Sequence, residues 1–160
     1  MREGTRNRIQ LTIIAALLVA IAVMAYKFIV VGAVAPAPDG RTAIVLEPGE
    51  RDFVLREMRG FVAALQQLTG ALSRNDMKAA AAAAKSMGMS AAHDAPSAIV
   101  AKLPLEFKTL AFSTHREFDA IAIDAESLGD AQHSLTQLSG VLGKCVACHE
   151  RYEFKLPAGG

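Results

Sequence analysis

Residues 50–73 read ERDFVLREMRGFVAALQQLTGALS and form a regular periodic stretch. Apolar residues recur in it at successive steps of four, three, four, three and four positions. They are Val54, Met58, Phe61, Leu65, Leu68 and Leu72. This spacing puts all six side chains on one face of an α-helix. The stretch therefore predicts an amphipathic helix whose apolar face packs against other parts of the chain.

Three more helices are expected, each set off from the next by residues that favour turns or caps. They run over about residues 76–87, 104–128 and 131–154, with a loop at 88–96 and with Asn75 or Asp76 as the cap of the first. The six alanines at 79–84 favour a helix because alanine has the highest helix propensity. Four helices with short connections predict an all-α fold, in which residues 50–160 form an antiparallel up-down-up-down four-helix bundle.

The first 31 residues form a separate segment. Residues 1–10 are basic, and residues 11–31 are uncharged except for Lys27. A helix of this length crosses the hydrocarbon core of a bilayer, with the Lys27 ammonium reaching the interface. The preceding arginines predict a single-pass anchor in the inner (cytoplasmic) membrane, with the rest of the chain in the periplasm. The alternative is a signal peptide cleaved near the small residues at 31–33, which exports the same domain.

Residues 32–49 differ in composition from the segments on either side. They contain three prolines and three glycines, which predicts a linker of mixed stiffness between the anchor and the bundle. Its short apolar stretch at 43–46 is the part most suited to dock on the domain.

Composition excludes several classes of function. The net charge is +1, and no basic patch is large enough for a nucleic-acid footprint, so nucleic acid is not an expected partner. Two cysteines cannot build a disulfide framework. We find no paired carboxylates, no arrangement of a nucleophile with a base and no phosphate-binding glycine loop, so the chain is not expected to be an enzyme.

The chemistry is concentrated in Cys145-Val146-Ala147-Cys148-His149, near the end of the fourth expected helix. This C-x-x-C-H pattern is typical of c-type haem attachment, because two thiols one turn apart reach the two vinyl groups and the adjacent imidazole meets the iron. A thioredoxin-like pair belongs at a helix N-terminus beside a βαβ unit, and a zinc site needs further ligands that this chain does not offer. The motif therefore predicts one covalently bound haem c.

A C-x-x-C-H motif near the end of four amphipathic helices resembles the cytochrome c′ / cytochrome c-556 family of haem-binding four-helix bundles. The resemblance covers about residues 47–157 and implies a role for Tyr152, the aromatic residue that follows the motif in that family. Glu153 stands where the family usually has an arginine, and the N-terminal anchor departs from soluble members. The resemblance also implies a homodimer that pairs through the first two helices.

The resemblance implies that a residue on the first helix decides whether the iron has a sixth ligand, and Met58 is the candidate here. In an antiparallel bundle the start of the first helix faces the end of the fourth, so Met58 and His149 are expected at similar heights, both pointing inward. Methionine also fills apolar cores, so Met58 as simple core packing remains the alternative. Other candidates for the sixth ligand are Met87, Met89, His93 and His115, whereas His133 lies too far from His149 along the same helix.

These expectations converge on a membrane-tethered electron carrier with one haem c, whose partners are membrane or periplasmic redox proteins. Histidine and methionine together leave no vacant position for a substrate on the iron. The alternative is a five-coordinate protein that binds or scavenges nitric oxide or carbon monoxide. A small peroxidase using Arg56 or Arg59, and a structural membrane protein with an incidental motif, are weaker alternatives.

Overall fold

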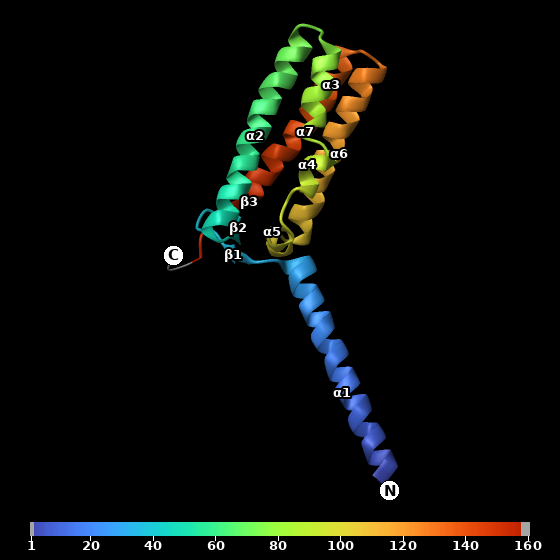
Figure 1. Ribbon diagram of the computed structural model, residues 1–160. Coiled ribbons are helices and arrows are strands. Elements are labelled where there is room, and N and C mark those ends of the chain that lie inside the picture. The colour runs from blue at the N-terminus through green and yellow to red at the C-terminus, as the bar shows by residue number, and fades with distance from the viewer. Residues whose placement is uncertain (1, 158–160) are drawn as a thin grey trace.

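The computed structural model describes residues 2–157, and most of them are helical (Figure 1). Helix α1 (Arg2–Ala25) continues into a π-helical segment, η1 (Tyr26–Val31), and together they project away from the rest of the chain. The stretch Arg6–Val31 has a mean hydropathy of 2.6 and is long and apolar enough to cross a membrane. The expected N-terminal apolar helix is therefore confirmed.

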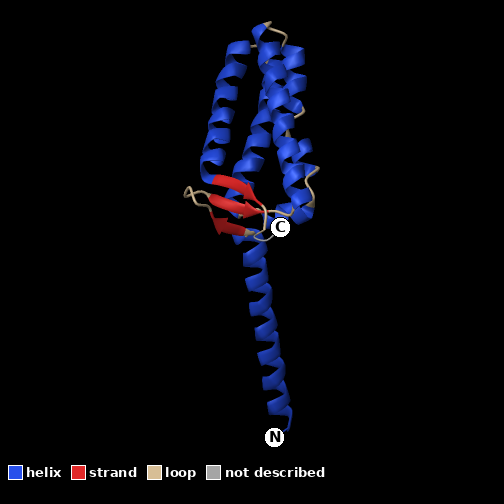
Figure 2. Ribbon diagram, turned by 90° about the vertical axis from the view of Figure 1, so that its left-hand side faces the viewer, coloured by secondary structure: helices blue, strands red, loops and turns tan. Residues whose placement is uncertain are grey.

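The other helices form a compact group above α1. They are α2 (Pro48–Ser73), α3 (Met77–Lys85), α4 (Met89–His93), α5 (Ser97–Lys102), α6 (Leu105–Ser127) and α7 (Ala131–Arg151). Figures 1 and 2 show α2, α3, α6 and α7 lying side by side. Helix α3 packs closely against α2 and α6, and α6 against α7, whereas α2 and α7 touch at few points. The prediction of a mostly helical chain is confirmed.

Local sequence explains where these helices begin. Glu47 and Glu50 form a capping box at the start of α2, where Pro48 occupies the first turn. The Asp76 carboxylate accepts a hydrogen bond from the Ala79 N–H over 3.0 Å, so Asp76 rather than Asn75 caps α3. Asp130 caps α7 in the same way, through the N–H groups of residues 132 and 133.

Two apolar clusters hold the domain together. The larger joins α2, α3, α6 and α7, and the alanines of α3 let that helix approach its neighbours closely. Its fully buried side chains include Leu68, Ala80, Phe118, Ile121 and Val141. The second cluster lies at the end of the domain nearest α1 and contains Ile44, Leu46, Ile99, Phe107 and Tyr152.

Residues 32–49, expected to form a linker, instead contribute two strands of a small sheet (Figure 2). Strand β1 (Val34–Pro36) pairs antiparallel with β2 (Thr42–Val45), and β2 pairs parallel with β3 (Tyr152–Lys155). The expected fourth helix therefore ends at Arg151 rather than near residue 154. Pairing with β2 and burial of Tyr152 favour the extended conformation over a further helical turn.

Residues 88–96, expected as a loop, contain the short helix α4. The Asp119 carboxylate on α6 accepts hydrogen bonds from the Met89 N–H over 2.8 Å and from the Lys85 ammonium over 2.7 Å. Gly88 is needed beside it, because a Cβ atom at this position would lie 2.2 Å from Asp119 Oδ1. A carboxylate from another helix thus caps α4, and this pairing across the fold is absent from the local sequence pattern.

The N-terminal apolar helix is joined closely to the domain at Gly32. This residue has a φ of +72°, and a Cβ atom on it would lie 2.5 Å from the carbonyl oxygen of Lys102. The Gly32 N–H donates to Lys27 O over 2.9 Å, and the Ala33 N–H donates to Lys102 O over 2.7 Å. The domain therefore meets the N-terminal apolar helix through backbone contacts.

Candidate functional site

The two cysteines lie on the inner face of α7. The buried or half-buried positions of this helix and the strand after it follow helical spacing. They include Ser134, Leu138, Val141, Cys145, Cys148 and Tyr152. Both thiols are free and half-buried, and Cys148 packs against the cluster of Phe107 and Tyr152. The motif thus presents two sulfur atoms to an apolar surface from one turn of helix.

The environment of the thiols argues against thiol–disulfide exchange. Burial raises the pKa of the Cys145 thiol above its usual range. Burial, together with the neighbouring Cys145, raises the pKa of the Cys148 thiol to about 11. Both groups are therefore neutral thiols at pH 7, whereas catalytic redox cysteines carry lowered pKa values.

His149 does not point into the core as expected, because its side chain is exposed. Its direction follows from the contacts of α7. Lys144 on α7 forms an ion pair with Glu117 on α6, so this flank of α7 faces α6. His149 lies about 140° around the helix axis from Lys144, since successive residues are about 100° apart. The imidazole is therefore on the opposite flank, toward α2.

Met58 lies on the flank of α2 that faces α7. Gln67 on the opposite flank of α2 borders a groove against α3. Met58 precedes Gln67 by nine residues and so projects about 180° away from it. Arg51, near the start of α2, donates a hydrogen bond to Phe154 O over 3.3 Å, which holds the start of α2 beside the end of α7. Met58 and His149 therefore lie on two helices at the same end of the domain.

Apolar side chains on these two flanks are unusually exposed. Val62 on α2 is 67% exposed, and Leu142 and Leu135 on α7 are each 40% exposed. The sparse contact between α2 and α7 explains this exposure. Flanks that face each other across a sparse contact and carry exposed leucine and valine fit a flat apolar group between them.

A separate cavity lies on the other side of Met58, enclosed by α2, the segment of α4 and α5, α6 and β3. Its volume is about 120 Å³. Met58 and His115 contribute to its wall, but Cys145, Cys148 and His149 do not. Met58 and His115 thus line the same cavity, an arrangement that helical spacing alone does not indicate.

Tyr152 is 7% exposed and packs edge-on against Phe107, with ring centroids 5.2 Å apart. Burial raises the pKa of its hydroxyl. The next residue, Glu153, forms an ion pair with Arg41 over 2.9 Å, and Arg41 also donates to the Tyr152 carbonyl oxygen over 3.3 Å. Sequence analysis missed Arg41, because only the pairing of β2 with β3 brings it to the end of α7.

The remaining ligand candidates lie in different surroundings. Met87 is buried, and its carbonyl oxygen accepts a hydrogen bond from His115 Nδ1 over 2.7 Å. His93 is exposed at the end of α4. His133 contacts Asp124 over 3.2 Å near the far end of α7, as expected of a residue that cannot reach the motif. Among residues 2–157, no three His, Cys, Asp or Glu side chains gather closely enough to hold a metal ion.

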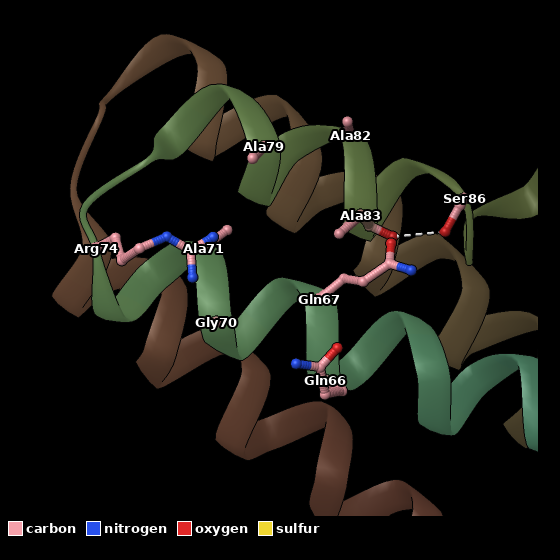
Figure 3. A pocket seen from close by; sticks show the side chains of 9 residues that line it. All are labelled: Gln66, Gln67, Gly70, Ala71, Arg74, Ala79, Ala82, Ala83 and Ser86. Atoms are coloured by element: carbon pink, nitrogen blue, oxygen red, sulfur yellow. Dashed lines mark hydrogen bonds between the residues drawn. The ribbon is translucent and has the colours of Figure 1, made fainter.

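A groove on the outer surface between α2 and α3 contains none of the candidate site residues. Figure 3 shows its alanine and glycine floor, with Gln67 reaching toward α3 and Arg74 lying back along α2 beside Ala71. The alanine face of α3 leaves this surface shallow and uncharged apart from Arg74, which suits contact with another helix.

Cys145, Cys148 and His149 on α7, with Met58 on α2, are the residues that could hold a haem c. Two thiols one turn apart at an apolar surface, an imidazole on the flank next to them and a thioether on the facing helix supply the donor set that such a group requires. No family model, characterised protein or solved structure matches this chain.

Proposed function

We propose that this chain is a membrane-tethered c-type cytochrome that carries single electrons outside the cytoplasm. The observation that carries the proposal is the arrangement of the C-x-x-C-H motif. Its Cys148 thiol packs against an apolar cluster, and helical spacing puts its imidazole on the flank of α7 away from α6. A neutral, half-buried thiol pair beside an exposed histidine suits covalent attachment of a cofactor.

Each residue has a distinct role in this proposal. Cys145 and Cys148 would hold the haem through thioethers, and His149 and Met58 would bind its iron. Tyr152 and Phe107 form the apolar wall behind Cys148 and exclude water from that side. When bound, the haem supplies a one-electron couple, and histidine with methionine favours a high potential.

The membrane helix and the basic residues before it support the remaining parts of the proposal. Arginines at positions 2, 6 and 8 favour a cytoplasmic N-terminus, which puts the haem domain in the periplasm. Membrane or periplasmic redox proteins are the partners of this carrier. In this proposal, the helices α2, α3, α6 and α7 form an antiparallel cytochrome c′-like bundle. The groove between α2 and α3 suits the contact of a homodimer.

A five-coordinate protein that binds nitric oxide or carbon monoxide is the second candidate, and one observation favours it. Met58 borders a cavity of about 120 Å³, which is ample for a diatomic gas beside the iron. In that case Met58 packs against the cavity wall and does not bind iron.

The absorption spectrum of the full chain, produced with a haem-maturation system, tests the proposal. We expect covalent haem in the unaltered chain and none in the Cys145→Ser/Cys148→Ser double variant, with Val146→Ala as the matched control on the same turn. A low-spin spectrum that carbon monoxide does not change supports the electron carrier. A high-spin spectrum that shifts with the gas supports the second candidate, and absence of covalent haem rejects both.

A further inference from the structure

The cavity beside Met58 is lined mainly by apolar side chains. Five phenylalanines contribute to its wall, namely Phe53, Phe61, Phe107, Phe112 and Phe154. Its volume of about 120 Å³ is similar to that of an apolar protein cavity of about 150 Å³ that admits benzene. The cavity therefore has the size and the lining for a single six-membered ring.

Three polar residues, Glu57, Lys108 and His115, contribute to the wall of this cavity, and the His115 imidazole is held in a fixed orientation. Its Nδ1 lies 2.7 Å from the carbonyl oxygen of Met87. A carbonyl oxygen only accepts, so Nδ1 carries the hydrogen and Nε2 of the neutral ring carries a lone pair. Nε2 has no hydrogen-bond partner within residues 2–157 and is not sealed from water. The imidazole is packed against Phe61, with ring centroids 5.3 Å apart, so its orientation is held from two sides.

The cavity lies at the end of the domain nearest the membrane helix. Lys108 contributes to its wall, and the Lys108 ammonium donates hydrogen bonds to Phe28 O over 3.1 Å and Ile29 O over 3.2 Å. Both carbonyls belong to η1, the last turn of the apolar segment. Helix α5, which also lines the cavity, lies above the end of α1 in Figure 1. An apolar molecule leaving the bilayer at this point meets the cavity directly.

We propose that this cavity binds a neutral phenolic ring, with the ring among the phenylalanines and its hydroxyl donating a hydrogen bond to His115 Nε2. A phenol matches the site because the cavity offers an apolar volume of one ring and an oriented imidazole acceptor in its wall. The ring comes either from a lipid-tethered phenol or hydroquinone in the membrane or from a small soluble phenol. None of Cys145, Cys148 and His149 lines the cavity, although Cys148 packs against the apolar cluster that contains Phe107.

Calorimetric titration of the full chain in detergent micelles with phenol and with benzene tests this proposal. We expect one phenol per chain, bound about tenfold more tightly than benzene, as one neutral hydrogen bond provides. Ala91→Leu fills the cavity from α4 and should abolish binding of both compounds. Ala98→Leu changes an exposed alanine outside the cavity and should leave binding unchanged.

The His115→Asn variant tests the proposed hydrogen bond to phenol without filling the cavity. The asparagine amide keeps an N–H near the position of Nδ1, which preserves the hydrogen bond to Met87 O, but it provides no acceptor near the position of Nε2. We expect this variant to bind phenol and benzene with equal affinity and to melt within a few degrees of the unaltered chain. Binding of phenol that neither Ala91→Leu nor His115→Asn weakens would overturn the proposal, as would the absence of binding.

A phenol with a ten-carbon tail, added to the chain in lipid nanodiscs, separates the two sources of the ring. Binding from the bilayer tighter than that of free phenol indicates the membrane, and binding of free phenol alone indicates the soluble source. The haem absorbance of the same samples keeps the two proposals apart. Covalent haem without phenol binding rejects this inference alone, whereas phenol binding without haem rejects the cytochrome alone.

Discussion

The ammonium of Lys108 donates a hydrogen bond to the carbonyl oxygen of Phe28 over 3.1 Å, although 80 residues separate the two in sequence. The last carbonyls of a helix have no partner within it, and a cation there also complements the helix dipole. Burial lowers the pKa of Lys108. This contact, together with the close approach at Gly32, fixes the position of the domain relative to the N-terminal apolar helix.

Gly32→Ala should destabilise the chain more than Gly40→Ala. Both glycines have a positive φ, at +72° and +88°, so each substitution carries the backbone cost of a non-glycine residue, about 1 kcal/mol. Only at Gly32 does the new Cβ meet backbone, 2.5 Å from Lys102 O, whereas the space around Gly40 is open within 4 Å. Thermal melting in detergent measures the difference. Equal losses of thermal stability at the two positions would show that the backbone around Gly32 shifts at little cost.

Asp119→Asn should lower the free energy of unfolding at pH 7. It should also make that free energy depend less on pH in the acidic range. The Lys85 ammonium and the Met89 N–H lower the pKa of Asp119 below its ordinary value of 3.8. The stabilisation from this carboxylate is therefore complete above pH 3.8 and is lost as the pH falls further. We expect a loss of about 1–2 kcal/mol at pH 7, measured by urea unfolding from pH 7 to pH 3.

Gly88→Ala provides an independent check of the same contact, because its Cβ displaces the Asp119 carboxylate. Gly60→Ala on α2 is the control, since nothing lies within 4 Å of its Cβ. Gly60→Ala should raise helix stability by about 0.5–1 kcal/mol. If Gly88→Ala stabilises the chain to the same extent, Asp119 does not cap α4.

Ser134→Ala should stabilise the chain by about 1 kcal/mol. Ser134 is fully buried, and its hydroxyl has no hydrogen-bond partner within the described residues. An unpaired buried hydroxyl costs free energy that alanine removes. Ser139→Ala, at an exposed position of the same helix, gains only from helix propensity. Urea unfolding of the two variants should therefore give the larger gain at position 134, and a smaller gain there would mean that the hydroxyl is paired in solution.

Met58→Leu should convert the proposed haem to high-spin iron with a lower potential. Leucine matches methionine in volume but carries no sulfur ligand, so the helix packing is retained. Met77→Leu is the control, because Met77 packs against the core at the start of α3, far from the motif. Absorption spectra and a redox titration measure the effect, and an unchanged spectrum would remove Met58 from the iron.

Much of the helical structure could be predicted from sequence, because its determinants are local. The stripe from Val54 to Leu72 lies in α2, whose buried positions include Leu68 and Leu72. The expected third helix matches α6 closely, and Asp76 caps α3 as one of two expected residues. In each case the information lies within a few turns of the element that it specifies.

The sheet and α4 could not be predicted because their partners are distant in sequence. Periodicity continues past Arg151 to Tyr152, but pairing with Thr42 makes that residue extended. Likewise α4 depends on Asp119, 30 residues beyond Met89. The exposure of His149 was not predicted for a related reason. The apolar periodicity of a single helix does not reveal that α2 and α7 make little contact.

During synthesis, β2 leaves the ribosome long before the strand that completes it, since Tyr152 lies 111 residues after Arg41. A chain cut short before Tyr152 still contains Cys145, Cys148 and His149, yet it lacks the strand beside Ile44. Such a fragment carries the C-x-x-C-H motif but lacks Tyr152 and Phe154, which belong to the apolar cluster beside Cys148. Closure of the sheet thus distinguishes chains that contain β3 from shorter ones that lack it.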